Sequence, residues 1–307
     1  MNVVHGHRNA PAWTGTAIAI GNFDGVHVGH RALIDRAREL AAARGLRAVA
    51  LTFDPHPSAV LAPQGAPPRV SSLARRLELL AAAGLDATVV EPFTHELAAY
   101  AADAFVDDIL LGALGARAIV VGYDFTYGHG RTGSTDALRA HGARAGALVE
   151  VVPPVEVGGE VASSSKIRSY LRAGDLPGAE RLLGRRWDID GTVVHGAKRG
   201  RAIGVPTANI APESDLAIAP GIYAVTLTPE SGAPLPAVAS LGTNPTFVEN
   251  GGLILEVHVL DWDGDLYDRR VRTTFVARLR DEARYASIDA LLAQIRLDIE
   301  QARAALA

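Results

Sequence analysis

The chain has 307 residues, of which 48% are hydrophobic and 21% are charged, and its formal net charge is −4. This composition is typical of a globular protein, and the acidic balance argues against a nucleic acid or an anionic membrane as partner. No apolar run reaches the ~18 residues of a membrane span, and the N-terminus lacks the apolar centre of a signal peptide. Cysteine is absent, which excludes disulfides and thiolate sites. We expect a cytoplasmic protein with two domains, because the chain is too long for one typical core.

Residues 16 to about 155 alternate strand-like and helix-like segments. Short apolar runs predict strands buried on both faces, at residues 16–20, 47–53, 87–92, 116–122 and 147–152. Amphipathic stretches predict helices at residues 31–43, 73–83, 103–114 and 135–145. This alternation predicts an α/β domain with a doubly wound parallel sheet, whose ligands bind at the carboxyl ends of the strands.

The pattern changes near Gly184, after which helix signals become scarce. Short strand-like runs separated by turn residues occur at residues 188–195, 221–227, 237–241, 253–260 and 271–279. They predict a small antiparallel β-barrel, followed by one terminal helix that Ser287 can cap. We therefore predict a first domain over residues 1–185 and a second over residues 186–307.

The most informative segment is Gly-Asn-Phe-Asp-Gly-Val-His-Val-Gly-His at residues 21–30. It joins a predicted strand to a predicted helix, where backbone N–H groups and the helix dipole favour an anion. His27 and His30 would act there on the charge that develops in an adenylyl transfer. The alternative interpretation is a capped helix start with two ordinary histidines.

A second segment, Ser-Ser-Ser-Lys-Ile-Arg at residues 163–168, places hydroxyls and cations at a predicted helix start. Such a start suits phosphate oxygens. The alternative is a serine cap followed by a solvated basic face.

A third segment, residues 195–209, combines three spaced glycines with three cations, Lys198, Arg199 and Arg201. Thr207 and Asn209 offer hard oxygen ligands, which suit Mg²⁺ rather than zinc. Taken alone, this segment favours a polar hairpin loop with a basic surface.

Together these segments resemble the prokaryotic bifunctional riboflavin kinase/FMN adenylyltransferase family, the FAD synthetases, from about residue 17 to residue 303. The resemblance rests on blocks at residues 19–30, 52–57, 121–128, 163–168, 204–209, 240–247 and 255–261. Four positions depart from the family pattern: Ser165 replaces threonine, Tyr127 and Tyr285 replace phenylalanine, and Asp268 replaces a turn glycine.

The resemblance implies a multifunctional transferase with two ATP-dependent steps. The riboflavin kinase-like barrel would convert riboflavin and ATP to FMN and ADP, and the nucleotidyltransferase domain would convert FMN and ATP to FAD and pyrophosphate. ATP is then a co-substrate and Mg²⁺ a cofactor. The implied partners are riboflavin, FMN, FAD and ATP, with no nucleic acid and no membrane, and with a weak or transient homo-oligomer at most.

The resemblance also assigns residues by position. His27 and His30 would bind ATP phosphates and stabilise the transition state, and Glu256 would accept the proton of the ribityl hydroxyl. The further ligands implied are Gly21, Phe23, Asp24, Asp124, Ser164 and Arg168 for the ATP of the adenylyl transfer, Phe53, Phe125 and Tyr127 on the adenine or flavin side, and Gly196, Lys198, Arg201, Thr207 and Asn209 for the ATP of the kinase, with Thr207 and Asn209 also holding Mg²⁺.

Three alternatives stay open at this point. Only the adenylyltransferase half is active if the changes at Asp268 and Tyr285 impair the kinase half. An aminoacyl-tRNA synthetase would share a His-x-Gly-His-like element, although the acidic charge and the Pro-Thr-Ala-Asn block at residues 206–209 argue against it. A flavin-binding regulator would bind flavin without turnover.

Overall fold

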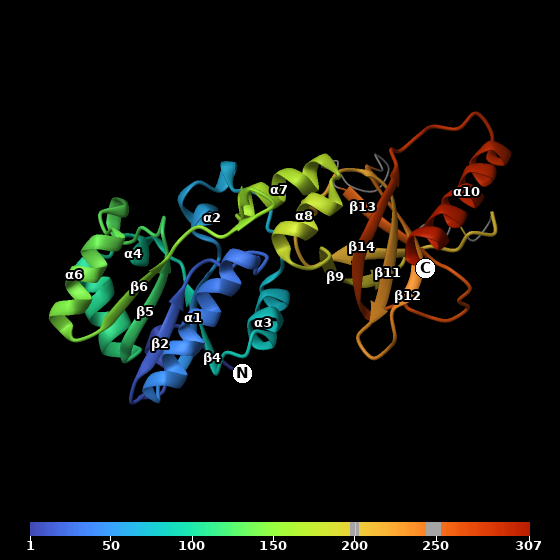
Figure 1. The fold of residues 1–307 in the computed structure, drawn as a ribbon. Coiled ribbons are helices and arrows are strands. Elements are labelled where there is room, and N and C mark those ends of the chain that lie inside the picture. The colour runs from blue at the N-terminus through green and yellow to red at the C-terminus, as the bar shows by residue number, and fades with distance from the viewer. Residues whose placement is uncertain (197–199, 201–202, 244–252) are drawn as a thin grey trace. The chain divides into compact units, whose positions relative to one another are not determined.

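The computed structural model describes residues 1–196, 200, 203–243 and 253–307 (Figure 1). By their contacts, the residues form two compact units. The first unit comprises Met1–Pro67 and Leu73–Ser163, and the second comprises Pro68–Ser72 and Ser164–Ala307. The boundary expected at residue 185 stays a prediction, because packing contacts do not show which segments act together. None of the helices in the described ranges has the length and apolar character that a membrane crossing needs.

The first unit is built on a six-stranded parallel sheet with the strand order β1-β4-β3-β2-β5-β6. Five strands match the predicted ones to within one residue. The sixth, β1, is a largely exposed edge strand that pairs with β4, so it shows no buried apolar run in the sequence. The strands are β1 (Asn2–His5), β2 (Thr16–Ile20), β3 (Arg47–Asp54), β4 (Ala87–Pro92), β5 (Ala116–Gly122) and β6 (Leu148–Val152).

Helices cover both faces of this sheet. Alternate residues of β2 enter two separate core clusters, because successive side chains of a strand point to opposite faces. Ala17 and Ala19 join the cluster of α1 and α3, whereas Ile18 and Ile20 join the cluster of η3 and α6. The helices are α1 (Val28–Arg44), α2 (Pro57–Leu61), α3 (Leu73–Ala82), α4 (His95–Ala98), α5 (Ala102–Ala104) and α6 (Thr135–Ala145), with the 3₁₀ turns η1 (His7–Asn9), η2 (Pro63–Gly65) and η4 (His129–Arg131) and the π-helix η3 (Phe105–Ala113).

Two local features of the first unit were not predicted. The helix expected at residues 103–114 forms as the short α5 followed by the π-helix η3, whose wider turns still bury Phe105, Val106, Ile109 and Leu110. A small hairpin, β7 (Glu156–Val157) and β8 (Glu160–Val161), follows the sheet. The doubly wound α/β architecture itself is confirmed.

The second unit is a closed antiparallel barrel with the strand order β10-β13-β12-β11-β14-β9, which confirms the predicted barrel and terminal helix. The short strand β10 lies at the end of the segment that looked like a loop in the sequence. The elements are α7 (Ser164–Ala173), α8 (Leu176–Leu183), β9 (Asp188–Val194), β10 (Ala208–Pro212), β11 (Gly221–Pro229), β12 (Leu235–Thr243), β13 (Leu253–Val259), β14 (Arg270–Arg280) and α10 (Ile288–Leu306).

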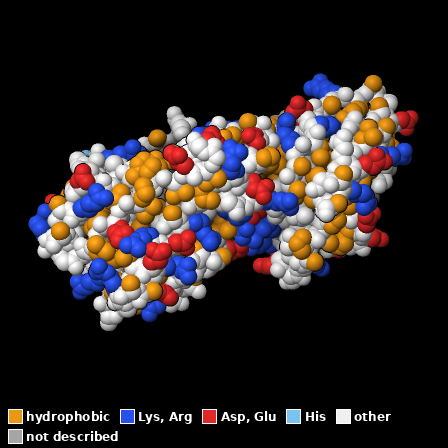
Figure 2. All heavy atoms as spheres, viewed as in Figure 1, with side chains coloured by type: hydrophobic (Ala, Val, Ile, Leu, Met, Phe, Trp, Pro, Cys, Tyr) orange, Lys and Arg blue, Asp and Glu red, His pale blue; other side chains and the backbone are white. Residues whose placement is uncertain are grey.

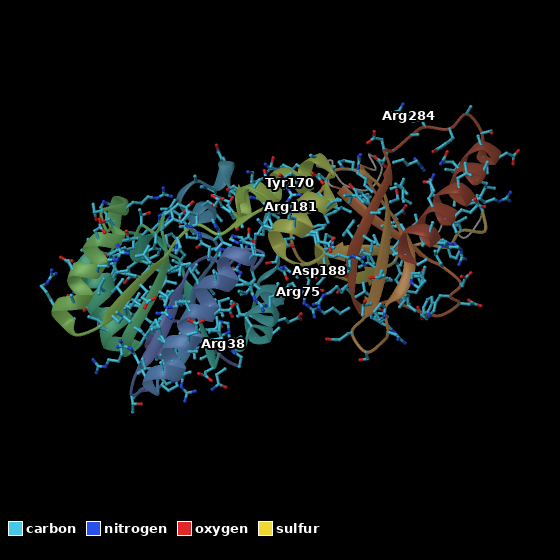
Figure 3. All side chains as sticks on the ribbon, in the orientation of Figure 1. Arg38, Arg75, Tyr170, Arg181, Asp188 and Arg284 are labelled. Atoms are coloured by element: carbon cyan, nitrogen blue, oxygen red, sulfur yellow. The ribbon has the colours of Figure 1, made fainter. Side chains whose placement is uncertain are left out.

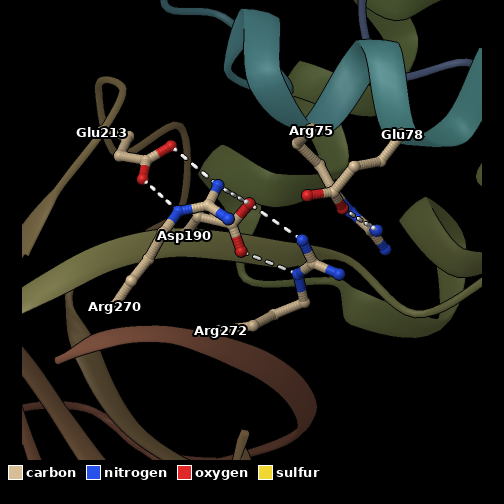
Figure 4. Close-up of polar contacts among 6 residues, drawn as sticks. All are labelled: Arg75, Glu78, Asp190, Glu213, Arg270 and Arg272. Atoms are coloured by element: carbon tan, nitrogen blue, oxygen red, sulfur yellow. Dashed lines mark hydrogen bonds and ion pairs between the residues drawn. The ribbon is translucent and has the colours of Figure 1, made fainter. Parts of the chain in front are cut away.

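A charged network joins β9 to β14 and helps to close the barrel (Figure 4). The Asp190 side chain is only 2% exposed and accepts hydrogen bonds from Nε and Nη2 of Arg272, at 2.7 and 2.9 Å. Arg270 donates to Asp190 at 3.1 Å and to Glu213 at 2.6 Å. A carboxylate at such a depth needs these partners, because an unpaired buried charge is costly.

Ion pairs also fix individual helices within each unit. Asp298 on α10 is buried and accepts two hydrogen bonds from Arg280 on β14, at 2.8 and 2.7 Å. On α3, Arg75 pairs with Glu78 one turn later at 2.9 Å. On the face shown in Figure 2, acidic and basic side chains are interspersed, which agrees with the small net charge of −4.

Candidate active sites

Three predicted motifs of the first unit lie at the same edge of the sheet. β2 is central, with β3 on one side and β5 on the other, and all three strands are parallel. The chain leaves β2 through α1 toward β3, so the strand order reverses between β2 and β5. Residues 21–30 and 123–127 follow the carboxyl ends of β2 and β5, and residues 53–57 span the carboxyl end of β3. This is the switch point where open α/β sheets bind ligands.

His27 is the N-cap of α1, and its ring has a defined hydrogen-bonding role. Its Nδ1 accepts a hydrogen bond from the backbone N–H of His30 at 3.3 Å. Because Nδ1 is an acceptor, the proton of the neutral ring resides on Nε2, which is then a donor. The helix-cap interpretation concerns Nδ1 of His27, whereas the predicted phosphate contact would use Nε2. The two interpretations are therefore compatible.

His30 stacks on His27, with ring centroids 3.6 Å apart and an interplanar angle of 20°. Its Nδ1 is buried and, within the part of the chain that the structure describes, has no hydrogen-bond partner. Burial, and then the charges of His27 and Arg76, hold the pKa of His30 well below its ordinary value of 6.5. The ring is therefore neutral near pH 7 and carries a polar atom that suits a ligand.

The turn before His27 has an unusual backbone. Phe23 and Val26 have positive φ angles of 49° and 41°, which non-glycine residues rarely adopt, and Gly25 between them has a φ of 81°. The Phe23 ring is buried and meets His30 edge-on, with centroids 5.2 Å apart. Asp24 is also buried. Strain of this kind persists only where the surroundings enforce it, and it is common at functional sites.

Two glycines of this motif lie against aromatic rings, and Gly29 has the tighter contact. A Cβ added at Gly29 would lie 3.0 Å from Cε1 and 3.1 Å from Nδ1 of His27, so the small residue lets the His27 ring lie against the helix start. A Cβ at Gly21 would touch the Phe23 ring at 3.4 Å. Gly29 was not among the predicted site residues, although the His-x-Gly-His spacing contains it.

The predicted aromatic and acidic residues occupy different environments. Phe53 is half-buried and meets Phe93 edge-on at 5.9 Å. Phe125 stacks on Tyr127 with centroids 5.5 Å apart, and Asp124 is exposed. Tyr127 is 7% exposed and belongs to the core cluster, where burial raises the pKa of its hydroxyl. Contact of these residues with adenine or flavin stays a prediction.

Ser164 begins α7, and Arg168 lies one turn further on, nearly buried. Arg168 Nη2 donates to Ser165 Oγ at 3.2 Å, so the serine that replaces threonine has a hydroxyl contact. By contacts, α7 belongs to the second unit. The phosphate-binding role of Ser164 and Arg168 stays a prediction.

In the barrel, Asn209 on β10 lies directly opposite Glu256 on β13, and Glu256 lies opposite Ser240 on β12. Leu255 and Val257, on either side of Glu256, are fully buried. Because side chains alternate along a strand, Glu256 points away from the barrel interior, together with Asn209. Glu256 is therefore on the same face of the barrel as Asn209 of the Pro-Thr-Ala-Asn block.

The neighbourhood of Asn209 is tight. A Cβ added at Gly196 would overlap the Asn209 side-chain amide, and one at Gly200 would overlap the carbonyl oxygen of Val205. Gly196 therefore lets backbone approach one of the two predicted Mg²⁺ ligands, and Gly200 allows a close backbone contact just before the other. Lys198 and Arg201 lie outside the described residues, and so does the segment 244–247 of a family block.

His258 is a residue that the sequence reasoning missed. It lies two positions after Glu256 on the same face, and its Nδ1 donates to the carbonyl oxygen of Pro206 at 2.7 Å. This bond ties the segment before Thr207 to β13. The available signal was a second polar residue at period two in the run Leu-Glu-Val-His-Val.

Asp268, which replaces a turn glycine of the family pattern, has a φ of +59°. Its backbone N–H still donates to the Val193 carbonyl at 3.0 Å. The position therefore has the left-handed conformation that explains a glycine there, and aspartate adopts it without loss of the turn. Tyr285 lies under the Arg280 guanidinium, 5.8 Å from the ring centroid.

Among the described residues, no group of three or more His, Cys, Asp or Glu side chains could hold a metal ion. The oxygen donors predicted for Mg²⁺ in the barrel are the hydroxyl of Thr207, just before β10, and the amide of Asn209 on β10. A hydroxyl and an amide oxygen fit Mg²⁺, which usually completes its shell with water and phosphate oxygens.

Comparison with known proteins matches both units. The FAD synthetase family model matches residues 9–166, and the riboflavin kinase family model matches residues 183–306. The bifunctional riboflavin kinase/FMN adenylyltransferase of Pseudomonas fluorescens is 40% identical over 305 residues, covering 99% of this chain and 97% of the relative. The protein of the same name from Escherichia coli K12 is 38% identical over 300 residues, covering 98% and 95%.

One solved structure extends this likeness to the whole fold. The crystal structure of a macrolide-efflux protein from Streptococcus pneumoniae superposes with a TM-score of 0.87 at 29% sequence identity, and 99% of each chain is covered. The resemblance found in the sequence blocks is thus supported along the full length. The chain belongs to the family of bifunctional riboflavin kinase/FMN adenylyltransferases.

Proposed function

We propose that the two activities of this bifunctional enzyme are divided between its two units. The first unit transfers AMP from ATP to FMN and releases pyrophosphate. The outer face of the barrel transfers the γ-phosphoryl group of ATP to riboflavin and releases ADP. ATP is the co-substrate of both reactions. The observation that carries the proposal is that each unit has its own group of candidate phosphate ligands, with His27 and His30 at the start of α1 in the first unit and Thr207 and Asn209 beside β13 in the second.

At the first site, His27 and His30 act on the triphosphate. The Nε2–H of His27 is a donor beside the N-terminus of α1, where backbone N–H groups and the helix dipole also favour an anion. Donors fixed in this way stabilise the charge that grows on the α-phosphate and on the departing pyrophosphate. His30, neutral before ATP binds, supplies a second ring nitrogen without a charge that would repel its neighbour.

At the second site, Glu256 accepts the proton of the ribityl 5′-hydroxyl as that oxygen attacks the γ-phosphorus of ATP. General-base assistance of this kind is typically worth 10²–10⁴-fold. Thr207 and Asn209 hold Mg²⁺, which, when bound, neutralises charge on the phosphates. His258 keeps the Pro206 segment against β13, so that Thr207 stays close to Asn209.

The alternatives raised by the sequence are not favoured. The hypothesis of an impaired kinase half depended on the changes at Asp268 and Tyr285. Asp268 has the backbone conformation that a turn glycine would have. An aminoacyl-tRNA synthetase does not account for a riboflavin kinase match over residues 183–306. A regulator without turnover has no need for two sets of phosphate-binding residues. The cytoplasmic location and the weak homo-oligomer expected from the sequence stay predictions.

The test is incubation with riboflavin, ATP and Mg²⁺, followed by chromatographic separation of the flavins. The wild-type chain forms FMN and then FAD. His27→Ala accumulates FMN, whereas Glu256→Ala makes FAD from added FMN but forms no FMN from riboflavin. Normal FAD formation by His27→Ala would refute the assignment of the first site.

A further inference from the structure

Arg76 is the largest of the fully buried side chains, with an exposed fraction of 1%. It lies on α3, on the same apolar face as Leu79 and Leu80. A guanidinium is always charged and is rarely buried to this depth without a specific task. The sequence alone does not distinguish Arg76 from its neighbour Arg75. In the structure Arg75 pairs with Glu78 one helical turn later.

The guanidinium of Arg76 reaches the loop after β2 and the end of β3, at the carboxyl edge of the sheet. Its Nη1 donates to the carbonyl oxygen of Asn22 at 3.1 Å, to Oγ1 of Thr52 at 3.1 Å and to the carbonyl oxygen of Phe53 at 3.0 Å. The hydroxyl of Thr52 in turn donates to the Asn22 carbonyl at 3.1 Å. Two donors thus converge on one backbone oxygen, and they tie the loop after β2 to the end of β3.

Asn22 is the residue just before the strained turn. Phe23, with its φ of 49°, follows directly, and its ring meets the ring of His30. A strained backbone is kept only when neighbouring groups over-determine it. The two hydrogen bonds to the Asn22 carbonyl supply that constraint. Because the Phe23 ring contacts the His30 ring, a fixed turn also restrains His30.

We propose that Arg76 is a positioning residue for adenylyl transfer, which fixes the Asn22–Phe23 turn and so holds His30 in place against His27. The inference rests on the proposed function of the first unit, because it gives Arg76 a task only if the two histidines act on ATP. Arg76 lies outside the sequence blocks that carry the family resemblance.

The charge of Arg76 gives the proposal a distinctive consequence. Within the described part of the chain, the charged and titratable groups that act on His30 are His27 at the start of α1 and Arg76 from α3, and Asp54 at the end of β3 lies 3.9 Å from the guanidinium. Loss of the positive charge lets His30 take up a proton at a higher pH. If the neutral ring is the active form, the acid limb of the pH profile then moves to higher pH.

The experiment compares two substitutions at Arg76. Arg76→Lys keeps the charge and loses the planar fork, and we expect kcat/KM for FMN adenylylation to fall about 10- to 100-fold with the acid limb in place. Arg76→Gln loses both, and we expect at least as large a fall together with an acid limb at higher pH. Riboflavin phosphorylation by the same preparations stays at the wild-type rate and reports intact protein.

Two further variants complete the test. Thr52→Val removes one of the two bonds to the Asn22 carbonyl and should lower kcat/KM for FMN adenylylation without moving the acid limb. Arg38→Gln removes an equal charge from α1 at a side chain that is 48% exposed (labelled in Figure 3), and neither readout should change. The Arg38 control separates a specific effect of Arg76 from a general loss of charge.

The proposal is overturned if Arg76→Gln retains wild-type kcat/KM for FMN adenylylation, or if Arg38→Gln lowers kcat/KM as much as Arg76→Gln does. If Arg76→Gln does not fold, wild-type kcat/KM in both Arg76→Lys and Thr52→Val overturns it instead. His27→Ala distinguishes the two levels of the argument. Normal FAD formation by His27→Ala would refute the proposed function of the first unit. If His27→Ala stops at FMN but the Arg76 variants keep wild-type kcat/KM for FMN adenylylation, only the role of Arg76 is refuted.

Discussion

Asn209 and Glu256 are directly opposite each other on β10 and β13, on the outer face of the barrel. This pairing puts an amide that suits Mg²⁺ and phosphate next to a carboxylate that suits a hydroxyl proton. Neither strand brings the pair together alone, since 46 positions separate the two residues in the sequence. The antiparallel register between β10 and β13 creates the juxtaposition.

Glu256→Gln should lower the rate of riboflavin phosphorylation by about 10²–10⁴-fold, because the amide cannot accept the hydroxyl proton. FAD formation from added FMN should continue at the wild-type rate. The two rates are measured separately, with riboflavin or FMN as the starting flavin. Glu230→Gln, an exposed glutamate after β11, serves as the matched control and should change neither rate.

Gly29→Ala should impair adenylyl transfer selectively. The added Cβ would lie 3.0 Å from the His27 ring, closer than ordinary van der Waals contact, so the ring must shift by a few tenths of an ångström. Because small displacements of a catalytic group are expensive, we expect kcat/KM for FMN adenylylation to fall by about 10-fold or more. Gly65→Ala is the control, since a Cβ there meets nothing within 4 Å. Equal adenylylation rates in the two variants would contradict the role of Gly29.

The buried His30 should make the stability of the protein depend on pH. Its pKa in the folded chain is well below the 6.5 of the unfolded chain, so the unfolded chain binds the proton more readily. This contribution to stability is fully present above about pH 6.5 and is lost as the pH falls toward the pKa of the folded state. Thermal unfolding midpoints between about pH 5 and pH 8 should fall less steeply on acidification in His30→Gln than in the wild type. His95→Gln, an exposed histidine at the start of α4, should retain the wild-type dependence.

The central strands were predictable because each is a continuous apolar run bounded by turn residues. β2 has five consecutive buried residues, and its predicted bounds were confirmed. β1 and β10 were missed for the opposite reason, since each is short and only partly buried. Their positions follow from pairing with β4 and β13, and pairing is not encoded in a local pattern.

The site was predictable where one segment carries several functional residues, as residues 21–30 do. It was not predictable where a distant segment supports them. Arg76 stands beside Arg75 and Glu78 in a predicted amphipathic helix, and only the tertiary structure brings it to Asn22 and Phe53. One signal was present, because Leu79 and Leu80 follow Arg76 at helical spacing and assign the arginine to the buried face.

The final prediction concerns Asp268, whose φ of +59° is in the left-handed region. A β-branched residue adopts this conformation at a cost of about 1–2 kcal/mol, part of which the aspartate already has, so Asp268→Val should lower the free energy of unfolding of the barrel by up to about 1 kcal/mol. Asp268→Gly relieves the strain of the aspartate, but it also makes the unfolded chain more flexible, at a cost of about 0.5–1 kcal/mol, so the two effects nearly cancel. Denaturant unfolding monitored by tryptophan fluorescence measures both changes, and Trp187 in the barrel core is one reporter. The kcat for riboflavin phosphorylation should be the same in Asp268→Gly and the wild type, because the turn already has the backbone that glycine would adopt. A clear gain of kinase activity in Asp268→Gly would instead mean that the aspartate impairs the kinase half.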